Sequence, residues 1–110
     1  MLSIAGNARI FVFQSPRDLR KGFEGLSLLV EEAFGDTLTS GAYFIFLNRR
    51  RDRMKVLYWD ADGLVIWYKR LEKGSFSPFY LQKSAMTRRE FLMLLEGIIP
   101  KRLQRRHSIF

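Results

Sequence analysis

Three short apolar runs with alternating polar positions lie close together in the middle of the chain. They are Tyr43–Leu47, Arg53–Trp59 and Leu64–Arg70, and polar clusters at residues 48–52 and 60–63 separate them. Aromatic and β-branched residues dominate these runs, which is typical of strands joined by hairpin turns. The pattern therefore predicts three antiparallel strands in sequence.

A four-residue turn at residues 60–63 predicts the register of the second hairpin. One side of the sheet then carries the pairs Trp59–Leu64, Leu57–Ile66, Lys55–Tyr68 and Arg53–Arg70. The other side carries Tyr58–Val65, Val56–Trp67 and Met54–Lys69. Because side chains alternate with period two, apolar pairs lie beside the acidic turn and cations gather at the opposite end. Like charges that face each other there repel unless an anion lies between them.

The residues before this region predict one strand and one helix. Arg9–Phe13 is a short apolar run that fits a fourth strand, and Pro16 follows it closely. From Asp18 onward apolar residues recur at three- and four-residue steps, with Ser15 or Asp18 as the cap and Gly35 at the end. Gly22 and Gly25 disfavour a helix interior. We therefore expect either an irregular first turn or a close approach of another group there.

A second helix is predicted after Thr87. Residues 87–90 form a capping box, apolar residues from Phe91 to Ile98 supply a buried face, and Gly97 and Pro100 end the helix. Before it, Pro78 favours an edge strand or an extended loop that carries Phe76, Phe79 and Tyr80.

These elements predict an α+β fold in which an antiparallel sheet of four or five strands packs against two helices. We expect one domain over residues 1–100 and a basic tail at 101–110 that is mobile or becomes ordered on a partner. The aromatic residues Phe44, Phe46, Tyr58, Trp59, Trp67 and Tyr68 are interpreted as core between sheet and helices. Three strands expose two apolar faces, so helices, a homo-oligomer or a partner protein must cover both.

The charge of the chain indicates an anionic partner. Nineteen Lys and Arg against eleven Asp and Glu give a net charge of +8. Nucleic acid is the commonest partner of a small basic domain, while anionic lipid or simple solubility are the alternatives. The chain has no cysteine, which excludes disulfides and thiolate metal sites. No apolar run approaches the roughly 18 residues of a membrane span, so we expect a soluble, cytoplasmic protein.

Two clusters of cations are candidates for phosphate contacts. The main cluster consists of Arg49, Arg50, Arg51, Arg53, Lys55, Lys69 and Arg70, with Trp59, Trp67 and Tyr68 nearby. Guanidinium groups match phosphate oxygens, and aromatic rings stack on unpaired bases. The second cluster is Arg17, Arg20 and Lys21 at the start of the first helix, where backbone donors also suit a phosphate. The alternatives are a solvated hairpin loop and an ordinary helix start.

No active site is apparent in the sequence. Asp60 and Asp62 could belong to a metal-dependent nuclease, yet Asp-Ala-Asp-Gly between two strands is first of all a turn, with Gly63 at the positive φ. His107 lies in the tail without a partner, and the serines lack a nucleophile-elbow context. We therefore expect neither enzymatic activity nor a cofactor.

Three segments carry a family resemblance that spans nearly the whole chain. They are SPRDLRKGFEGLSLLV, FIFLNRRRDRMKVLYWDADGLVIWYKRLEKGSF and TRREFLMLLEGI. Their pattern resembles the TnpB accessory proteins of the insertion sequence 66 family of bacterial transposable elements, which differ from the far larger RNA-guided nuclease of the same name. The matching positions are Asp18, Arg20, Lys21, Gly22, Phe23, Gly25, Leu26, Phe44, Phe46, Asn48, Arg49, Arg50, Asp52, Arg53, Lys55, Leu57, Trp59, Asp60, Gly63, Tyr68, Lys69, Arg70, Leu71, Glu72, Gly74 and Phe76.

The resemblance implies a role in transposition beside a separate transposase that carries the strand-cutting chemistry. Together with the charge, it favours a non-catalytic accessory protein that binds DNA through the two basic clusters. The alternative is a protein-interaction module that bridges the transposase and another protein of the element through the aromatic face and the SPFYL segment. In that alternative the positive charge serves only solubility.

Overall fold

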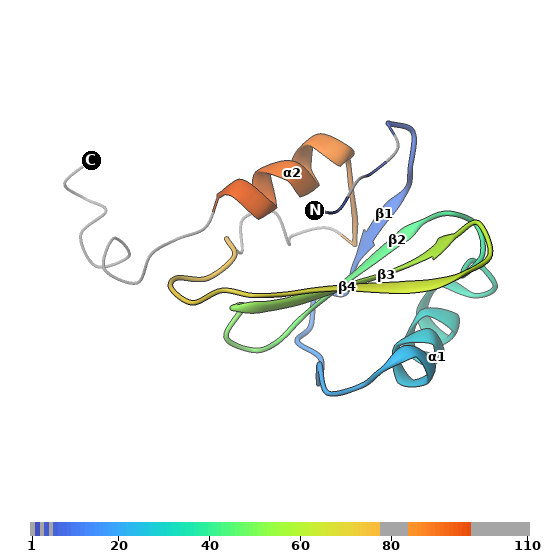
Figure 1. Ribbon diagram of the computed structural model, residues 1–110, viewed down its shortest axis with the longest axis horizontal. Helices are drawn as coiled ribbons and strands as arrows, with labels where there is room; N and C mark the ends of the chain where they lie inside the picture. The colour runs from blue at the N-terminus through green and yellow to red at the C-terminus, as the bar shows by residue number, and fades with distance from the viewer. Residues whose placement is uncertain (1, 3, 5, 78–83, 98–110) are drawn as a thin grey trace.

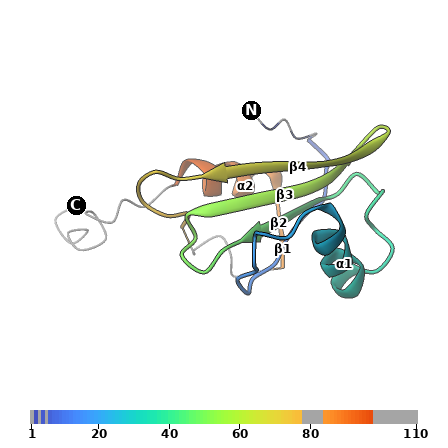
Figure 2. The ribbon, with the colours of Figure 1, turned by 60° about the horizontal axis from the view of Figure 1, so that its bottom comes forward.

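The computed structural model describes residues 2, 4, 6–77 and 84–97. In this part of the chain two helices lie on opposite faces of a five-stranded sheet (Figure 1). The elements are β1 (Ile10–Val12), α1 (Phe23–Phe34), β2 (Tyr43–Leu47), β3 (Arg53–Asp60), β4 (Gly63–Arg70), β5 (Ala85–Met86) and α2 (Arg88–Glu96). The strand order is β4-β3-β2-β1-β5, which places β4 at one edge of the sheet (Figure 2). The predicted α+β fold with two helices is confirmed.

The predicted register of the second hairpin is confirmed over its whole length. β3 pairs antiparallel with β4, and Arg53 faces Arg70 while Asp60 faces Gly63. The turn differs from the prediction in one respect, because Ala61 has the positive φ, 55°, and Gly63 does not. The tight turn needs a left-handed residue at its first central position, and Gly63 is already part of the strand.

β1 corrects the expectation of an entirely antiparallel sheet. It pairs parallel with β2, with Ile10 facing Tyr43, and pairs antiparallel with β5 on its other side. The reason is topological: α1 connects β1 to β2, and a strand–helix–strand crossover returns the chain in the same direction. The other three strand pairs are antiparallel.

α1 begins at Phe23, five residues after the predicted start at Asp18. The Asp18 carboxylate accepts the backbone N–H of Arg20 at 3.0 Å, which closes a local turn instead of capping a helix. Gly22 is then extended and becomes the N-cap. At the other end, Gly35 has a φ of 70° and its N–H donates to the Glu31 carbonyl, so the predicted helix end is confirmed.

The alternation of side chains along β2 builds two separate cores. Ile45 faces α2 and packs with Phe91, whereas Phe44 and Phe46 face α1 and pack with Leu26. All of these side chains are completely buried. Tyr68 behaves differently from the aromatic residues of β2, since 49% of it is exposed. The helices therefore cover the central strands better than they cover β4.

The capping box of α2 is present as predicted. Thr87 accepts the backbone N–H of Glu90, and the Glu90 carboxylate accepts the N–H of Thr87. Upstream, Phe76 is completely buried. Residues 78–83 of the predicted edge segment, including Phe79 and Tyr80, lie outside the described residues, as do Pro100 and the tail at 101–110.

Candidate nucleic-acid interface

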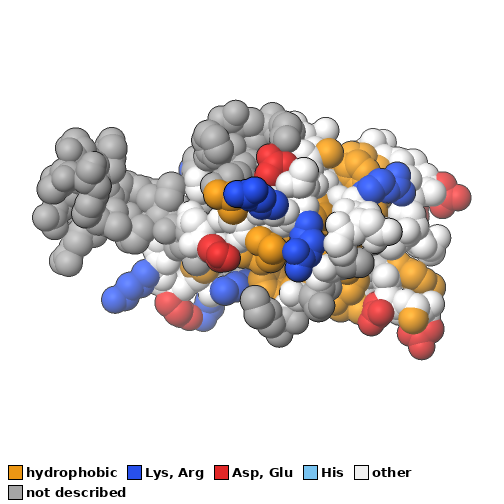
Figure 3. Space-filling view, turned by 90° about the horizontal axis from the view of Figure 1, so that it is seen from above, with side chains coloured by type: hydrophobic (Ala, Val, Ile, Leu, Met, Phe, Trp, Pro, Cys, Tyr) orange, Lys and Arg blue, Asp and Glu red, His pale blue; other side chains and the backbone are white. Residues whose placement is uncertain are grey.

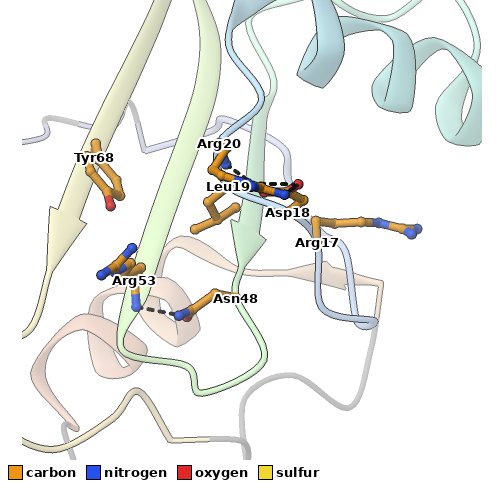
Figure 4. Close-up of a pocket in the computed structure, with 7 residues that line it drawn as sticks. All are labelled: Arg17, Asp18, Leu19, Arg20, Asn48, Arg53 and Tyr68. Atoms are coloured by element: carbon orange, nitrogen blue, oxygen red, sulfur yellow. Dashed lines mark hydrogen bonds and ion pairs between the residues drawn. The ribbon is translucent and has the colours of Figure 1, made fainter.

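Two segments that are far apart in the sequence meet on the face of the sheet that carries α1. They line a hollow of about 420 Å³ formed by Arg17, Asp18, Leu19, Arg20, Asn48, Arg53 and Tyr68. Figure 4 shows the loop before α1 lying beside Arg53 of β3 and Tyr68 of β4, while the Arg17 side chain extends away from them. Members of both predicted cation clusters thus border one depression.

Asp18 holds the Arg20 side chain at this hollow. Arg20 Nε and Nη2 donate to the Asp18 carboxylate at 3.0 and 2.8 Å. These hydrogen bonds hold the pKa of Asp18 well below its usual range and raise that of Arg20. The Arg20 side chain remains 91% exposed. Because a guanidinium has five N–H groups and Asp18 engages two, three remain without a partner among the described residues.

Lys55 connects the two segments. Its Nζ donates to the Lys21 carbonyl at 2.9 Å and lies 5.2 Å from the centre of the Tyr68 ring. This ammonium group therefore fixes the loop before α1 against β3 and orients Tyr68. The Lys21 side chain lies against Gly25, where an added Cβ would come within 3.0 Å of Lys21 Cβ. Each of the two predicted reasons for a glycine therefore applies to one position. Gly22 lies at an irregular helix start, and Gly25 allows the close approach of the Lys21 side chain.

Asn48 shapes the turn that presents the arginine run. Its Oδ1 accepts the backbone N–H groups of Asp52 and Arg53 at 3.1 and 2.9 Å, and its Nδ2 donates to the Asp52 carboxylate at 2.6 Å. Arg49 and Arg50 lie exposed on this turn. The turn therefore holds two guanidinium groups in solvent next to the hollow.

Arg51 has a different environment from its two neighbours. It is half-buried and has a φ of 56°, and its carbonyl accepts the N–H of Phe76 at 2.7 Å. Its Nε is buried and has no hydrogen-bond partner among the described residues. Arg51 therefore joins the turn to the segment after β4 and is less available to a ligand than Arg50.

The remaining predicted cations lie on two faces. Arg53 and Arg70 are directly opposite each other on the α1 face, and Arg70 forms an exposed ion pair with Glu72 at 3.4 Å. Lys69 is opposite the buried Met54 and so lies on the α2 face. On that side, basic groups are interspersed with acidic and hydrophobic ones (Figure 3). The predicted main cluster is therefore divided between the two faces, and Arg53 is its one member among the residues that line the hollow.

Sequence reasoning missed the two residues that organise this surface, Asp18 and Asn48. The sequence pattern offers Asp18 as one of two alternative helix caps, beside Ser15, and Asn48 only as part of a polar cluster. An Asp two residues before an Arg, and an Asn at the first position of a hairpin loop, are local signals for such side-chain to backbone bonds.

Other candidate chemistry gains no support. In residues 6–77 and 84–97, no group of three or more His, Cys, Asp or Glu lies close enough together to hold a metal ion. No helix in the described part of the chain is long and apolar enough to cross a membrane.

Comparison with known proteins identifies the family. The family model described as IS66 Orf2-like protein matches residues 8–105. The chain belongs to this family. Two relatives come from Sinorhizobium fredii: uncharacterized protein y4jC is 33% identical over 96% of this chain and 92% of its own length, and uncharacterized protein y4hO is 33% identical over 69% and 66%. No solved structure matches the chain.

Membership of the IS66 Orf2-like family confirms the resemblance in the sequence, and this family suggests an accessory role in transposition. This is not a family of known catalytic proteins. The family match also extends from the described core into the basic segment after residue 100.

Proposed function

We propose that this IS66 Orf2-like protein acts in transposition by binding DNA through the α1 face of its sheet. The main phosphate contacts are Arg20 and Arg53 at the hollow and Arg49 and Arg50 on the adjacent turn. The observation that carries the proposal is the meeting of cations from two separate segments around one depression. Arg17, Lys21, Lys55 and Arg70 surround these contacts, while Arg51 and Lys69 contribute less.

The arrangement suits a phosphate chain better than a single small anion. Arg53 and Arg70 face each other across the strand pair, and a phosphate between them would offset the repulsion that the exposed Arg70–Glu72 ion pair leaves. Guanidinium groups bind phosphate oxygens through paired N–H donors. The half-exposed Tyr68 ring adds a surface against which a sugar or an unpaired base can pack. Such contacts supply affinity and little sequence discrimination.

A salt series on purified protein tests this proposal. Affinity for terminal-repeat and random duplexes should fall steeply with salt, because bound phosphates release counterions. The double variant Arg50→Ala with Arg53→Ala should lower the slope of log affinity against log salt by up to about 2, since each lost duplex contact removes roughly 0.9. Fluorescence anisotropy at five or more salt concentrations measures the slope.

Arg89→Ala provides the matched control, because Arg89 is an exposed arginine on α2, on the opposite side of the sheet. It should leave the slope unchanged. Binding that is insensitive to salt, or an equal effect of Arg89→Ala, would contradict the assignment of DNA to the α1 face.

A second candidate function is supported by exposed hydrophobic side chains on α1. Phe23 is 50% exposed and Leu28 is 56% exposed, which favours contact with a protein such as the transposase of the same element. A pull-down of that transposase that survives nuclease treatment and is lost with Leu28→Glu would support this role. Capture that depends on added DNA would assign the interaction to the nucleic acid instead.

A further inference from the structure

The outer edge of β4 is open in the described part of the chain. β4 is the last strand in the sheet order, so its backbone pairs with β3 on one side only. From Gly63 to Tyr68 it carries neither a charged residue nor a proline. Natural edge strands use charged residues and prolines to prevent pairing with another chain. The edge is therefore suited to accept a further strand.

The hydrogen bonds of the hairpin define which backbone groups are available. The Leu71 N–H donates to the Asp52 carbonyl at 2.7 Å, so this pair is hydrogen-bonded across the hairpin. Because hydrogen-bonded pairs alternate along antiparallel strands, odd-numbered residues of β4 direct their backbone groups to β3. The N–H and carbonyl groups of Leu64, Ile66 and Tyr68 consequently point outward.

We propose that β4 pairs antiparallel with β4 of a second copy of this chain, about a two-fold axis at Ile66. Ile66 then faces its own counterpart, and Tyr68 faces Leu64 of the second copy. All of these residues offer outward backbone groups, so the pairing forms hydrogen bonds in both directions. One step further along, Arg70 of each copy lies opposite Asp62 of the other.

Charge complementarity selects this occupant and this register. β4 has a basic end and an acidic turn before its start, so two antiparallel copies bring opposite charges together twice. A two-fold axis at Trp67 would place Arg70 opposite Leu64 and lose both pairs. Asp60 ends β3 and Glu72 lies beyond the end of β4, so neither carboxylate belongs to the paired edge.

The dimer would place both candidate DNA surfaces on one side. A two-fold axis between antiparallel strands of one sheet runs perpendicular to the sheet, so α1 of both copies lies on the same face. Tyr68, which lines the hollow, sits next to Leu64 of the other copy at the seam. The dimer itself does not depend on DNA binding and is tested separately.

Disulfide trapping tests the register directly, because the natural chain has no cysteine. In Ile66→Cys the two Cα atoms would lie about 5.5 Å apart, within disulfide range. Leu64→Cys is the control: its own counterpart lies four residues along the strand, roughly 13 Å away. Mild oxidation should cross-link Ile66→Cys at least about tenfold more than Leu64→Cys. Equal cross-linking of the two variants would overturn the register.

Charge exchange combined with sedimentation equilibrium tests the ion pairs. Asp62→Lys or Arg70→Glu alone should weaken the dimer roughly tenfold, because two attractions become two repulsions. The double variant should restore dimerisation to within about threefold of the natural protein. Failure of this rescue would overturn the assigned contact.

Hydrogen exchange of the Ile66 amide distinguishes a second copy from a segment of the same chain. Protection that rises with protein concentration supports the dimer. Protection that does not depend on concentration would mean that the chain covers its own edge, and a monomer at several hundred micromolar would likewise overturn the proposal.

Discussion

At the scale of single residues, Asp18 controls how much positive charge the hollow presents. Its carboxylate occupies two N–H groups of Arg20 and cancels one charge next to Arg53. Asp18→Asn should therefore bind duplex DNA roughly two- to fivefold more tightly, which corresponds to about 0.5–1 kcal/mol. Anisotropy titrations of both proteins in the same buffer measure the difference.

The depressed pKa of Asp18 provides the control for this prediction. Folding lowers the pKa of Asp18, so its carboxylate stabilises the folded state at any pH above the pKa of an Asp in the unfolded chain, about 3.9. This stabilisation is lost only as the pH falls through the lower pKa of the folded state. The hydrogen bonds between the Asp18 carboxylate and the Arg20 guanidinium therefore stay intact at pH 5 and above. The affinity ratio of variant to natural protein should be equal at pH 5 and pH 8. An affinity ratio that differs between pH 5 and pH 8, or weaker DNA binding by Asp18→Asn, would contradict the proposed effect of Asp18 on Arg20.

The different environments of the three arginines in the turn after Asn48 could not be predicted from the sequence. The arginine run was correctly predicted to be a turn, but its members appeared equivalent. The turn conformation separates them, because the positive φ falls on Arg51 and turns its carbonyl toward Phe76. Which residue of a polar loop takes that position depends on what packs beneath it, and Phe76 is distant in sequence.

At the scale of elements, α2 depends on its N-terminal cap. Four backbone N–H groups at a helix start lack partners within the helix. The Thr87–Glu90 capping box satisfies one of them, the N–H of Glu90, and also the N–H of the cap residue Thr87. Thr87→Ala should lower the free energy of unfolding by about 1 kcal/mol. Urea denaturation followed by circular dichroism measures this change.

Thr87→Ser retains the hydroxyl and is the matched variant for that experiment. It should remain within about 0.5 kcal/mol of the natural protein. If Thr87→Ala and Thr87→Ser were equally stable, the capping hydrogen bond would not contribute to stability.

The register of the β3–β4 hairpin was predictable because its signals are local, whereas the prediction of a positive φ at Gly63 was wrong. Period-two alternation marks both strands, and the short turn between them leaves one register. The start of α1 was not predictable in the same way. Helical spacing of apolar residues begins at Leu19, but the side chain of Asp18 bonds the N–H of Arg20, and the first regular turn forms only after Gly22.

At the scale of the whole molecule, both proposals together predict avidity. Two DNA surfaces held on one face should engage a long duplex simultaneously. Ile66→Cys protein, once oxidised to the cross-linked dimer, should bind a duplex of about 30 base pairs at least roughly tenfold more tightly than the reduced protein at low nanomolar concentration.

A duplex long enough for only one surface is the control for this comparison and should show no gain. Equal affinity of oxidised and reduced protein for the long duplex would mean that the two surfaces do not act together, even if each proposal holds by itself.

The sequence alone determined strands β1 to β4, the presence of both helices, the hairpin register, the charge and the family, because each is encoded by neighbouring residues or by a motif. The tertiary structure decided the parallel pairing of β1 with β2 and the meeting of Arg20 with Arg53. The first depends on the crossover through α1, and the second on the packing of the loop before α1 against β3. Local periodicity identifies a buried face, whereas only packing determines which segment covers it.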